Sequence, residues 1–251
     1  MANDAGGSVR WVEVAPDRLA GWLESFASRH GGAVLTPPEG PGASVVTVAA
    51  ADGAAAHCHP PFPPVPWPDG PGGDDDGRDP GAELARAAGR IAAHACADRT
   101  VGVLLVRLGG YAAGVFAGQP PRLAASKVGA RLVHGRSAAG GTSQQRFARR
   151  REKQASEALA AAADTAAAVF GGHAGELDAV VLGGDRRAMA GLRDDPRLRG
   201  YFALAAERFL TVPDPRLAVL RTAPRLYQAI RIQLEQPAEK ALPARSASRV
   251  E

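Results

Sequence analysis

The sequence has little cysteine and no long apolar run. Among its 251 residues are only two cysteines, Cys58 and Cys96, which are too few for a disulfide framework and indicate a reducing compartment. No apolar run is long enough to span a bilayer, and the N-terminus lacks the basic start and apolar stretch of a signal peptide. These absences argue against a membrane protein or a disulfide-stabilised secreted domain, and they predict a cytoplasmic protein.

Aromatic residues are also scarce, at 5% of the chain, although hydrophobic residues make up 45%. A chain of this length and composition can bury a core without disulfides or a structural metal. Because alanine is heavily used, we expect helices and sheets to pack closely through small side chains.

The positive charge is concentrated in one segment. Residues 121–154 contain nine arginines and lysines and one acid, for a net charge of +8. Since the whole chain carries +4, the remaining residues sum to −4. A basic segment on an otherwise mildly acidic chain predicts one surface that faces a polyanion.

Hydrophobic periodicity predicts an α/β protein with a mixed sheet. Strands are expected at 10–14, 44–48, 101–108, 111–117, 122–133, 177–182 and 208–212, with turns at Asp52-Gly53 and Gly109-Gly110. Helices are expected at 16–29, 80–97 and 144–170, after Asp185, and from about residue 213 to Leu234.

Composition also suggests how the chain is divided. Residues 1–9 are expected to be flexible, and residues 236–251 to form a disordered tail. Residues 10–98 are expected to form an N-terminal subdomain containing a loop rich in proline, glycine and aspartate at 60–79. Residues 99–235 are expected to form a second, larger domain.

The segment HGRSAAGGTSQQRFARRREKQ, residues 134–154, combines three features. Its glycines and small residues form a thin loop that can enter a narrow cleft in another molecule. Arg146, Arg149, Arg150 and Lys153 follow at helical spacing on one face, which suits contacts with phosphates. Two glutamines at the junction offer neutral carboxamides that donate and accept hydrogen bonds. A solvated basic helix behind a mobile loop is the alternative interpretation.

Several blocks occur in a fixed order: VGVLLVRLGGYAAGVFAG, then HGR followed by GG and RFARRREK, then AVVLGGD, and finally ERFLTVPDP. In these blocks, over roughly residues 100–235, the chain resembles the archaeo-eukaryotic release-factor superfamily. The closest branch is that of the Vms-one-like release factors (VLRF) of the bacterial, actinobacterial type. The resemblance implies an RNase H-like release-factor catalytic domain, here with an N-terminal α/β extension.

The resemblance also implies a function. The protein is expected to act in ribosome rescue, within ribosome-associated quality control of translation, as a peptidyl-tRNA hydrolase of stalled large subunits. Its expected partners are the large ribosomal subunit, ribosomal RNA and peptidyl-tRNA. It would need no metal or other cofactor and is expected to be a monomer. Neither a stop-codon-reading domain nor a C-terminal partner-binding domain is recognisable, which favours codon-independent rescue over ordinary termination.

The resemblance assigns roles to the loop and the helix behind it. Release factors carry Gly-Gly-Gln, whereas Thr142 follows the glycine pair here, so the catalytic glutamine is displaced. The catalytic residues are expected to be Gly140 and Gly141, which let the loop enter the peptidyl-transferase centre, and Gln144, with Gln145 as the competitor. The expected RNA contacts are Arg136, Arg146, Arg149, Arg150 and Lys153, and the expected loop-supporting residues are His134, Gly135, Thr142 and Ser143.

Two other functions remain open. A noncatalytic ribosome- or RNA-binding factor would keep the basic surface but lose the chemistry, as the altered triplet suggests. A nuclease would instead cut the 3′ end of the tRNA.

Three further patterns are interpreted as structural. His57-Cys58-His59 with His94 and Cys96 lacks the regular spacing of a zinc site. Gly183-Gly184-Asp185 is interpreted as a tight turn and helix cap, because it lacks the spacing of a dinucleotide or phosphate-binding loop. Trp11, Trp22 and Trp67 are interpreted as packing residues rather than as a platform for stacking bases.

Overall fold

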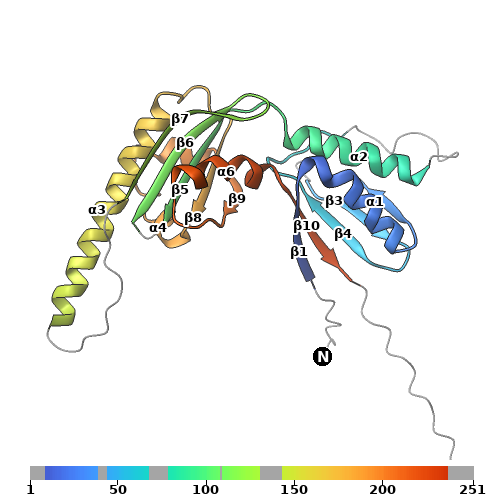
Figure 1. The fold of residues 1–251 in the computed structure, drawn as a ribbon, viewed down its shortest axis with the longest axis horizontal. Helices are drawn as coiled ribbons and strands as arrows, with labels where there is room; N and C mark the ends of the chain where they lie inside the picture. Colours follow the sequence, from blue (N-terminus) through green and yellow to red (C-terminus); the bar gives the residue numbers. More distant parts are fainter. Residues whose placement is uncertain (1–8, 39–43, 68–78, 108, 131–142, 237–251) are drawn as a thin grey trace, which may run out of the picture.

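The fold was analysed in a computed structural model, which describes residues 9–38, 44–67, 79–107, 109–130 and 143–236. These residues form a mixed α/β structure with two five-stranded sheets (Figure 1). The expected α/β class is therefore confirmed. The predictions for residues 1–8, for 68–78 of the expected loop and for the tail from 237 onward concern residues outside the described ranges. None of the described helices is long and apolar enough to cross a membrane.

The first sheet is antiparallel throughout and has the order β1-β10-β4-β3-β2. Its strands are β1 (Val9–Val14), β2 (Ala33–Thr36), β3 (Val46–Ala50), β4 (Ala55–His59) and β10 (Ile230–Glu235). Helix α1 (Leu19–Arg29), preceded by the short helix η1 (Pro16–Arg18), packs with α2 (Pro80–Ala95) over one face. Leu19, Leu23 and Ile91 from these helices are buried against Val46, Val48 and Ile232 of the sheet.

The second sheet is mixed and has the order β7-β6-β5-β8-β9. Its strands are β5 (Val101–Arg107), β6 (Gly110–Ala117), β7 (Arg122–Ala130), β8 (Ala179–Gly184) and β9 (Ala205–Leu210). The expected β5–β6 hairpin is present, and β8 runs parallel to both β5 and β9. The central strands are buried on both faces because a helix layer covers each side.

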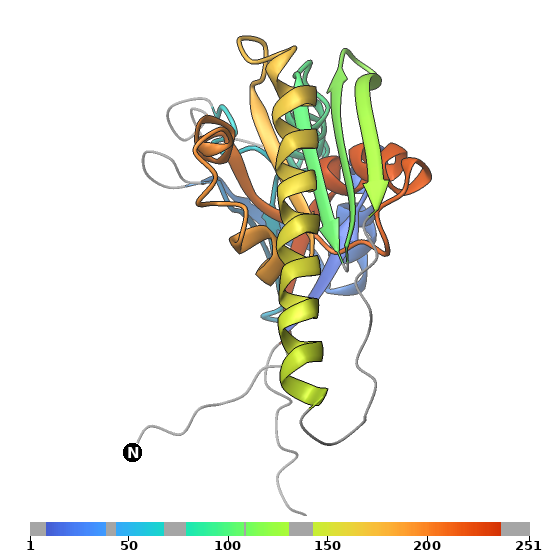
Figure 2. The ribbon, with the colours of Figure 1, turned by 90° about the vertical axis from the view of Figure 1, so that its left-hand side faces the viewer.

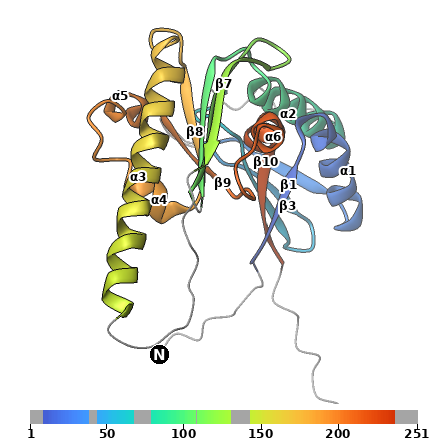
Figure 3. The same ribbon diagram turned by 60° about the vertical axis from the view of Figure 1, so that its left-hand side comes forward.

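One face of the second sheet is covered by α3 (Ser143–Gly171), with α4 (Arg186–Ala190) and α5 (Arg199–Ala203) beside it. The other face is covered by α6 (Leu217–Gln228). Figure 3 shows the sheet between α3 and α6, with α6 on the side facing the first sheet. The long helix is therefore carried on the outer side of the second sheet.

The C-terminal strand β10 corrects one sequence prediction. The expected helix from residue 213 to Leu234 ends at Gln228, and Ile230–Glu235 is a strand. This strand lies between β1 and β4, so the chain returns to the sheet in which it started. Ile230 and Ile232 face the core in alternation with the exposed Arg231, and that period of two is typical of a strand. Strand β2 is a further element that the sequence analysis did not anticipate.

Candidate functional site

Among the described residues, the long helix α3 packs on the second sheet through its C-terminal half only. Its 29 residues extend for about 43 Å at the rise of an α-helix. Ala162, Ala163 and Ala166 are buried against the second sheet, and Phe170 fixes the last turn. Figure 2 shows the N-terminal half of the helix extending well beyond the sheet. Since a projecting helix half has few tertiary contacts, α3 presents its N-terminal turns to the surroundings.

Close packing anchors the C-terminal half. Alanines line the buried face of α3, as expected from the composition, and allow the helix to approach β6, where Ala113 is fully buried. At the far end, Phe170 lies edge-on to Tyr201, with 5.2 Å between ring centroids. The same ring lies over Gly102, where a Cβ atom would come within 3.1 Å of it. Apolar contacts at this end therefore position the projecting half.

The glutamines lie at the free end of this helix. α3 begins at Ser143, so Gln144 and Gln145 belong to its first turn, close to the expected start at residue 144. The helix continues through residues 146–153, and the side chains of Arg149 and Lys153 are exposed. Lys153 Nζ lies 3.9 Å from the exposed Glu157 carboxylate, a surface pair that holds neither group firmly.

The other predicted site residues either lie outside the described ranges or are described by their backbone alone. His134, Gly135, Arg136, Gly140, Gly141 and Thr142 belong to residues 131–142, which lie outside the described ranges. For Ser143, Gln144, Gln145, Arg146 and Arg150 the structure describes the helical backbone but not the side chains. The structure thus brings both glutamines to one end of one helix, while the role of each remains a prediction.

A groove of about 690 Å³ lies where α3 leaves the second sheet. Tyr111 and the β5–β6 turn form one wall, Ala155 and Leu159 of α3 form another, and Arg187 of α4 lies at the side. The sequence contains no motif that would have predicted this groove, because its lining residues come from three separate segments. The groove is therefore a largely apolar hollow at the point where the N-terminal half of α3 leaves the second sheet.

The Gly183-Gly184-Asp185 pattern has the structural role predicted for it. Gly184 has φ +100°, and a Cβ atom there would lie 2.2 Å from the Val106 carbonyl oxygen, so only glycine fits. The Asp185 carboxylate accepts a hydrogen bond from the Ala188 backbone N–H at 2.9 Å and caps α4. A tight turn and a helix cap therefore account for this motif.

The histidines and cysteines are dispersed. Cys58 is fully buried in the core of the first sheet, where burial raises the pKa of its thiol to about 12. On the opposite face, the His57 ring lies 3.0 Å from the Thr47 hydroxyl. His94 Nε2 lies 2.8 Å from the Phe62 carbonyl oxygen, to which it donates a hydrogen bond. Within the described ranges, no group of three or more His, Cys, Asp or Glu side chains is arranged to hold a metal.

The packing role predicted for the tryptophans is confirmed for two of the three. Trp22 and Trp67 pack against the core of the first sheet, as expected. Trp11 remains 44% exposed, and its ring lies on the sheet face opposite α1 and α2. The sequence of this short N-terminal strand does not indicate on which face of the sheet Trp11 lies.

The comparisons with known proteins agree with the block order in the sequence. A family model described as Actinobacteria/chloroflexi VLRF1 release factor matches residues 99–233, more than half of the chain. The matched segment begins just before β5, includes the whole of α3 with both glutamines, and ends within β10. No match is found among curated proteins. The extent of the family match shows that this chain belongs to the Actinobacteria/chloroflexi VLRF1 release factor family.

Proposed function

We propose that this protein hydrolyses the ester bond of peptidyl-tRNA in the peptidyl-transferase centre of stalled large ribosomal subunits, without reading a codon. The observation that carries the proposal is the position of Gln144 and Gln145. They lie in the first turn of a helix that is anchored at its other end. This helix is part of the segment that matches the release-factor family. The protein acts in the cytoplasm on the large subunit, ribosomal RNA and peptidyl-tRNA.

The reaction needs a positioned water molecule rather than a protein nucleophile. Water adds to the ester carbonyl carbon, and the tetrahedral intermediate then expels the 3′ oxygen of the tRNA. One proton of the water is transferred to that oxygen, so the products are a tRNA hydroxyl and a peptide carboxylic acid, which releases its remaining proton to solvent. A glutamine carboxamide can hold the water by donating and accepting hydrogen bonds. Catalysis is then mainly a matter of positioning.

The helix extends the glutamines toward the peptidyl-transferase centre, and its basic face binds RNA. The exposed Arg149 lies about one turn behind Gln145, and the exposed Lys153 lies about two turns behind it. Together with Arg136, Arg146 and Arg150 they contact RNA phosphates, while Gly140 and Gly141 keep the preceding loop thin enough to enter the centre. Gln144 is the catalytic residue, Gln145 is its competitor, and His134, Gly135, Thr142 and Ser143 support the loop.

The test measures release of labelled peptide from stalled large subunits that carry peptidyl-tRNA. The wild-type protein should release the peptide, and Gln144→Ala should slow release by at least about 100-fold, as expected when one positioned hydrogen-bonding group is lost. Gln145→Ala should have a smaller effect, and Gln154→Ala, further along the same helix, should release peptide at the wild-type rate. Full activity in the variant with both Gln144→Ala and Gln145→Ala would refute the mechanism.

The tRNA product separates the proposal from the two other functions. An end-labelled tRNA with an intact 3′ end after release indicates ester hydrolysis, whereas a shortened tRNA indicates a nuclease. Wild-type protein that binds the subunit, with no release of peptide and no cleavage of tRNA, would instead indicate a noncatalytic binding factor.

A further inference from the structure

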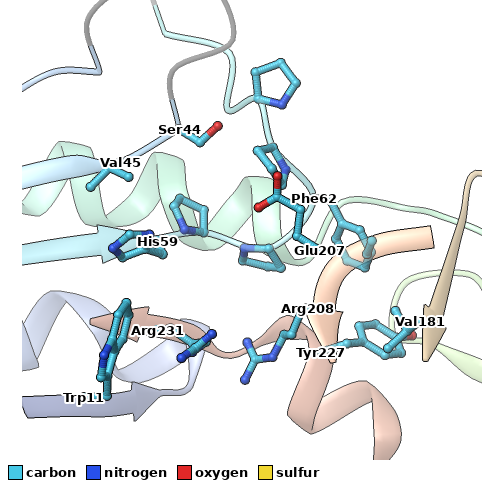
Figure 4. A pocket seen from close by; sticks show the side chains of 15 residues that line it. Trp11, Ser44, Val45, His59, Phe62, Val181, Glu207, Arg208, Tyr227 and Arg231 are labelled. Carbon is cyan, nitrogen blue, oxygen red and sulfur yellow. The ribbon is translucent and has the colours of Figure 1, made fainter. Parts of the chain in front are cut away.

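A cleft of about 460 Å³ lies on the face of the first sheet that α1 and α2 leave uncovered. Its other walls come from β9 and α6 of the second part and from the proline-rich segment after β4 (Figure 4). Its volume falls within the usual range for small-molecule sites. The cleft contains no residue of α3, so it is separate from the site proposed for peptide release.

Aromatic and cationic side chains from three adjacent strands form the floor of this cleft. Arg231 on β10 is the register partner of both Glu13 on β1 and His59 on β4. The Arg231 guanidinium lies over the Trp11 ring, 4.4 Å from its centroid. The rings of Trp11 and His59 are 5.0 Å apart and tilted by 50°. A large aromatic ring that is 44% exposed beside a second ring provides a surface for a planar ligand.

One of the two arginines that line the cleft has no carboxylate partner among the described residues. Arg208 also lines the cleft, but its guanidinium is bound to Glu13 Oε1 at 2.8 Å. Burial lowers the pKa of Arg208; the Glu13 carboxylate opposes this shift and the nearby Arg231 adds to it. Within the described ranges, Arg231 makes no ion pair with a carboxylate. Arg231 is therefore the cation available to an anionic ligand.

One carboxylate, that of Glu207, lines the cleft. It lies on the side nearer Phe62 in Figure 4, away from Trp11. Burial lowers the pKa of His59; Arg231 and His57 add to this shift, and Glu207 opposes it. A phosphate bound on the Trp11 side of Arg231 therefore lies away from this carboxylate.

Tyr227 lies at the opposite end of the cleft from Trp11, next to Val181 (Figure 4). Its side chain is buried in the core of the second sheet. The edge-on contact of Tyr227 with Phe62, at 5.7 Å, holds the phenol ring in place. Tyr227 therefore closes this end of the cleft, and the floor around Trp11 and Arg231 is the part open to a ligand.

We propose that this cleft binds a nucleoside phosphate. The base stacks on the exposed part of the Trp11 ring beside His59, and the phosphate pairs with the Arg231 guanidinium, which already lies over that ring. A free nucleotide and a single nucleotide extruded from RNA offer the same chemistry. Stacking on an aromatic ring tolerates any base, so the site is expected to select for a nucleotide before it selects for a sequence.

The test is isothermal titration calorimetry on the full chain. The probes are the four ribonucleoside 5′-monophosphates, adenosine, ribose 5-phosphate and a short single-stranded RNA. At least one monophosphate or the RNA should bind saturably, and adenosine and ribose 5-phosphate should bind more weakly because each lacks one contact. Tight binding of the RNA with weak binding of the monophosphates would show that the ligand is a nucleotide of an RNA chain. The reverse result would show that it is a free nucleotide. The absence of saturable binding by any of these probes would refute the proposal.

The variants identify the cleft as the site. Arg231→Gln and Trp11→Ala should each weaken binding by about 10-fold, as for the loss of an ionic or stacking contact. Tyr227→Phe removes only the buried hydroxyl at the opposite end of the cleft and should leave the affinity unchanged. The matched control is Arg90→Gln, because Arg90 lies over Trp67 at 4.9 Å on α2 and does not line the cleft.

Thermal unfolding of each variant checks that it is folded, and Trp11→Leu replaces Trp11→Ala if the alanine variant fails that check. Wild-type affinity in both Arg231→Gln and the folded Trp11 variant would refute the assignment of the ligand to this cleft. Equal affinity for ribose 5-phosphate and the monophosphates would refute the stacking contact.

Discussion

The guanidinium of Arg208 on β9 lies 2.8 Å from the carboxylate of Glu13 on β1, and this ion pair joins the second sheet to the first. The same guanidinium donates a hydrogen bond to the Ala229 carbonyl, at the end of α6 just before β10. The Arg208 side chain is only 12% exposed, whereas Glu13 is 54% exposed. One arginine therefore holds three segments where the two parts of the fold meet.

Replacing Arg208 should cost more stability than replacing Glu13. Arg208→Met leaves the Ala229 carbonyl without its donor and should lower the free energy of unfolding by about 2 kcal/mol, as for the loss of a charged hydrogen bond. Glu13→Gln should lower the free energy of unfolding by less than about 1 kcal/mol, because water screens an ion pair whose carboxylate is exposed. Urea denaturation measures both, with the exposed Arg225→Met as control. An equal loss for the two variants would show that the ion pair, not the carbonyl contact, dominates.

The exposed cations of α3 should determine how strongly ribosome binding depends on salt. The double variant Arg149→Gln with Lys153→Gln removes two charges and should reduce the slope of log affinity against log salt by up to about 2, through lost phosphate contacts. Co-sedimentation with large subunits over a range of salt concentrations measures this slope. The matched control, Arg221→Gln with Arg225→Gln on α6, removes the same net charge. An identical reduction in the control would mean that overall charge, and not this helix, is responsible.

Stability should fall as the pH is lowered from 7 to 5. Burial lowers the pKa of His94; the Phe62 carbonyl opposes this shift and Arg99 adds to it. In the unfolded chain a histidine takes up its proton near pH 6.5, so below this pH the unfolded state binds more protons than the folded state. Each buried histidine then lowers the free energy of unfolding by at most about 1.4 kcal/mol per pH unit, and stability is constant above that window.

The measurement is urea denaturation between pH 5 and pH 8. His94→Gln should flatten the decline below pH 7, and adding His59→Gln should flatten it further, because burial lowers the pKa of His59 as well. A wild-type stability that does not change, or that rises, between pH 7 and 5 would contradict the prediction. The same decline in His94→Gln as in wild type would assign it to other groups.

The elements predicted from sequence are those with a strong local pattern. The β5–β6 hairpin is a continuous apolar run broken by two glycines, and α3 is a long run of alanine at helical spacing; both are confirmed. The helix cap at Asp185 was also predictable, because the turn and its cap need only neighbouring residues. The error over residues 229–234 arose because the alternation of Ile230, Ile232 and Leu234 is short and directly follows a true helix.

The release-factor motifs were also readable from sequence, because their order along the chain is a linear property, and the family match includes them. The linear sequence likewise places Gln144 beside a basic helix. It cannot show that the C-terminal half of this helix, which includes Ala162, Ala166 and Phe170, packs on the sheet while the other end projects, because that depends on which strands the helix covers.

The sequence by itself determined the α/β class, the long basic helix and the release-factor blocks, because each of these depends on local periodicity or on order along the chain. Only the tertiary structure decided that β10 returns to lie between β1 and β4. That pairing brings Arg231 beside Trp11, 220 positions earlier in the chain. Contacts between residues so far apart in sequence are set by which strands pair and by the burial of their apolar faces, and no local pattern encodes them.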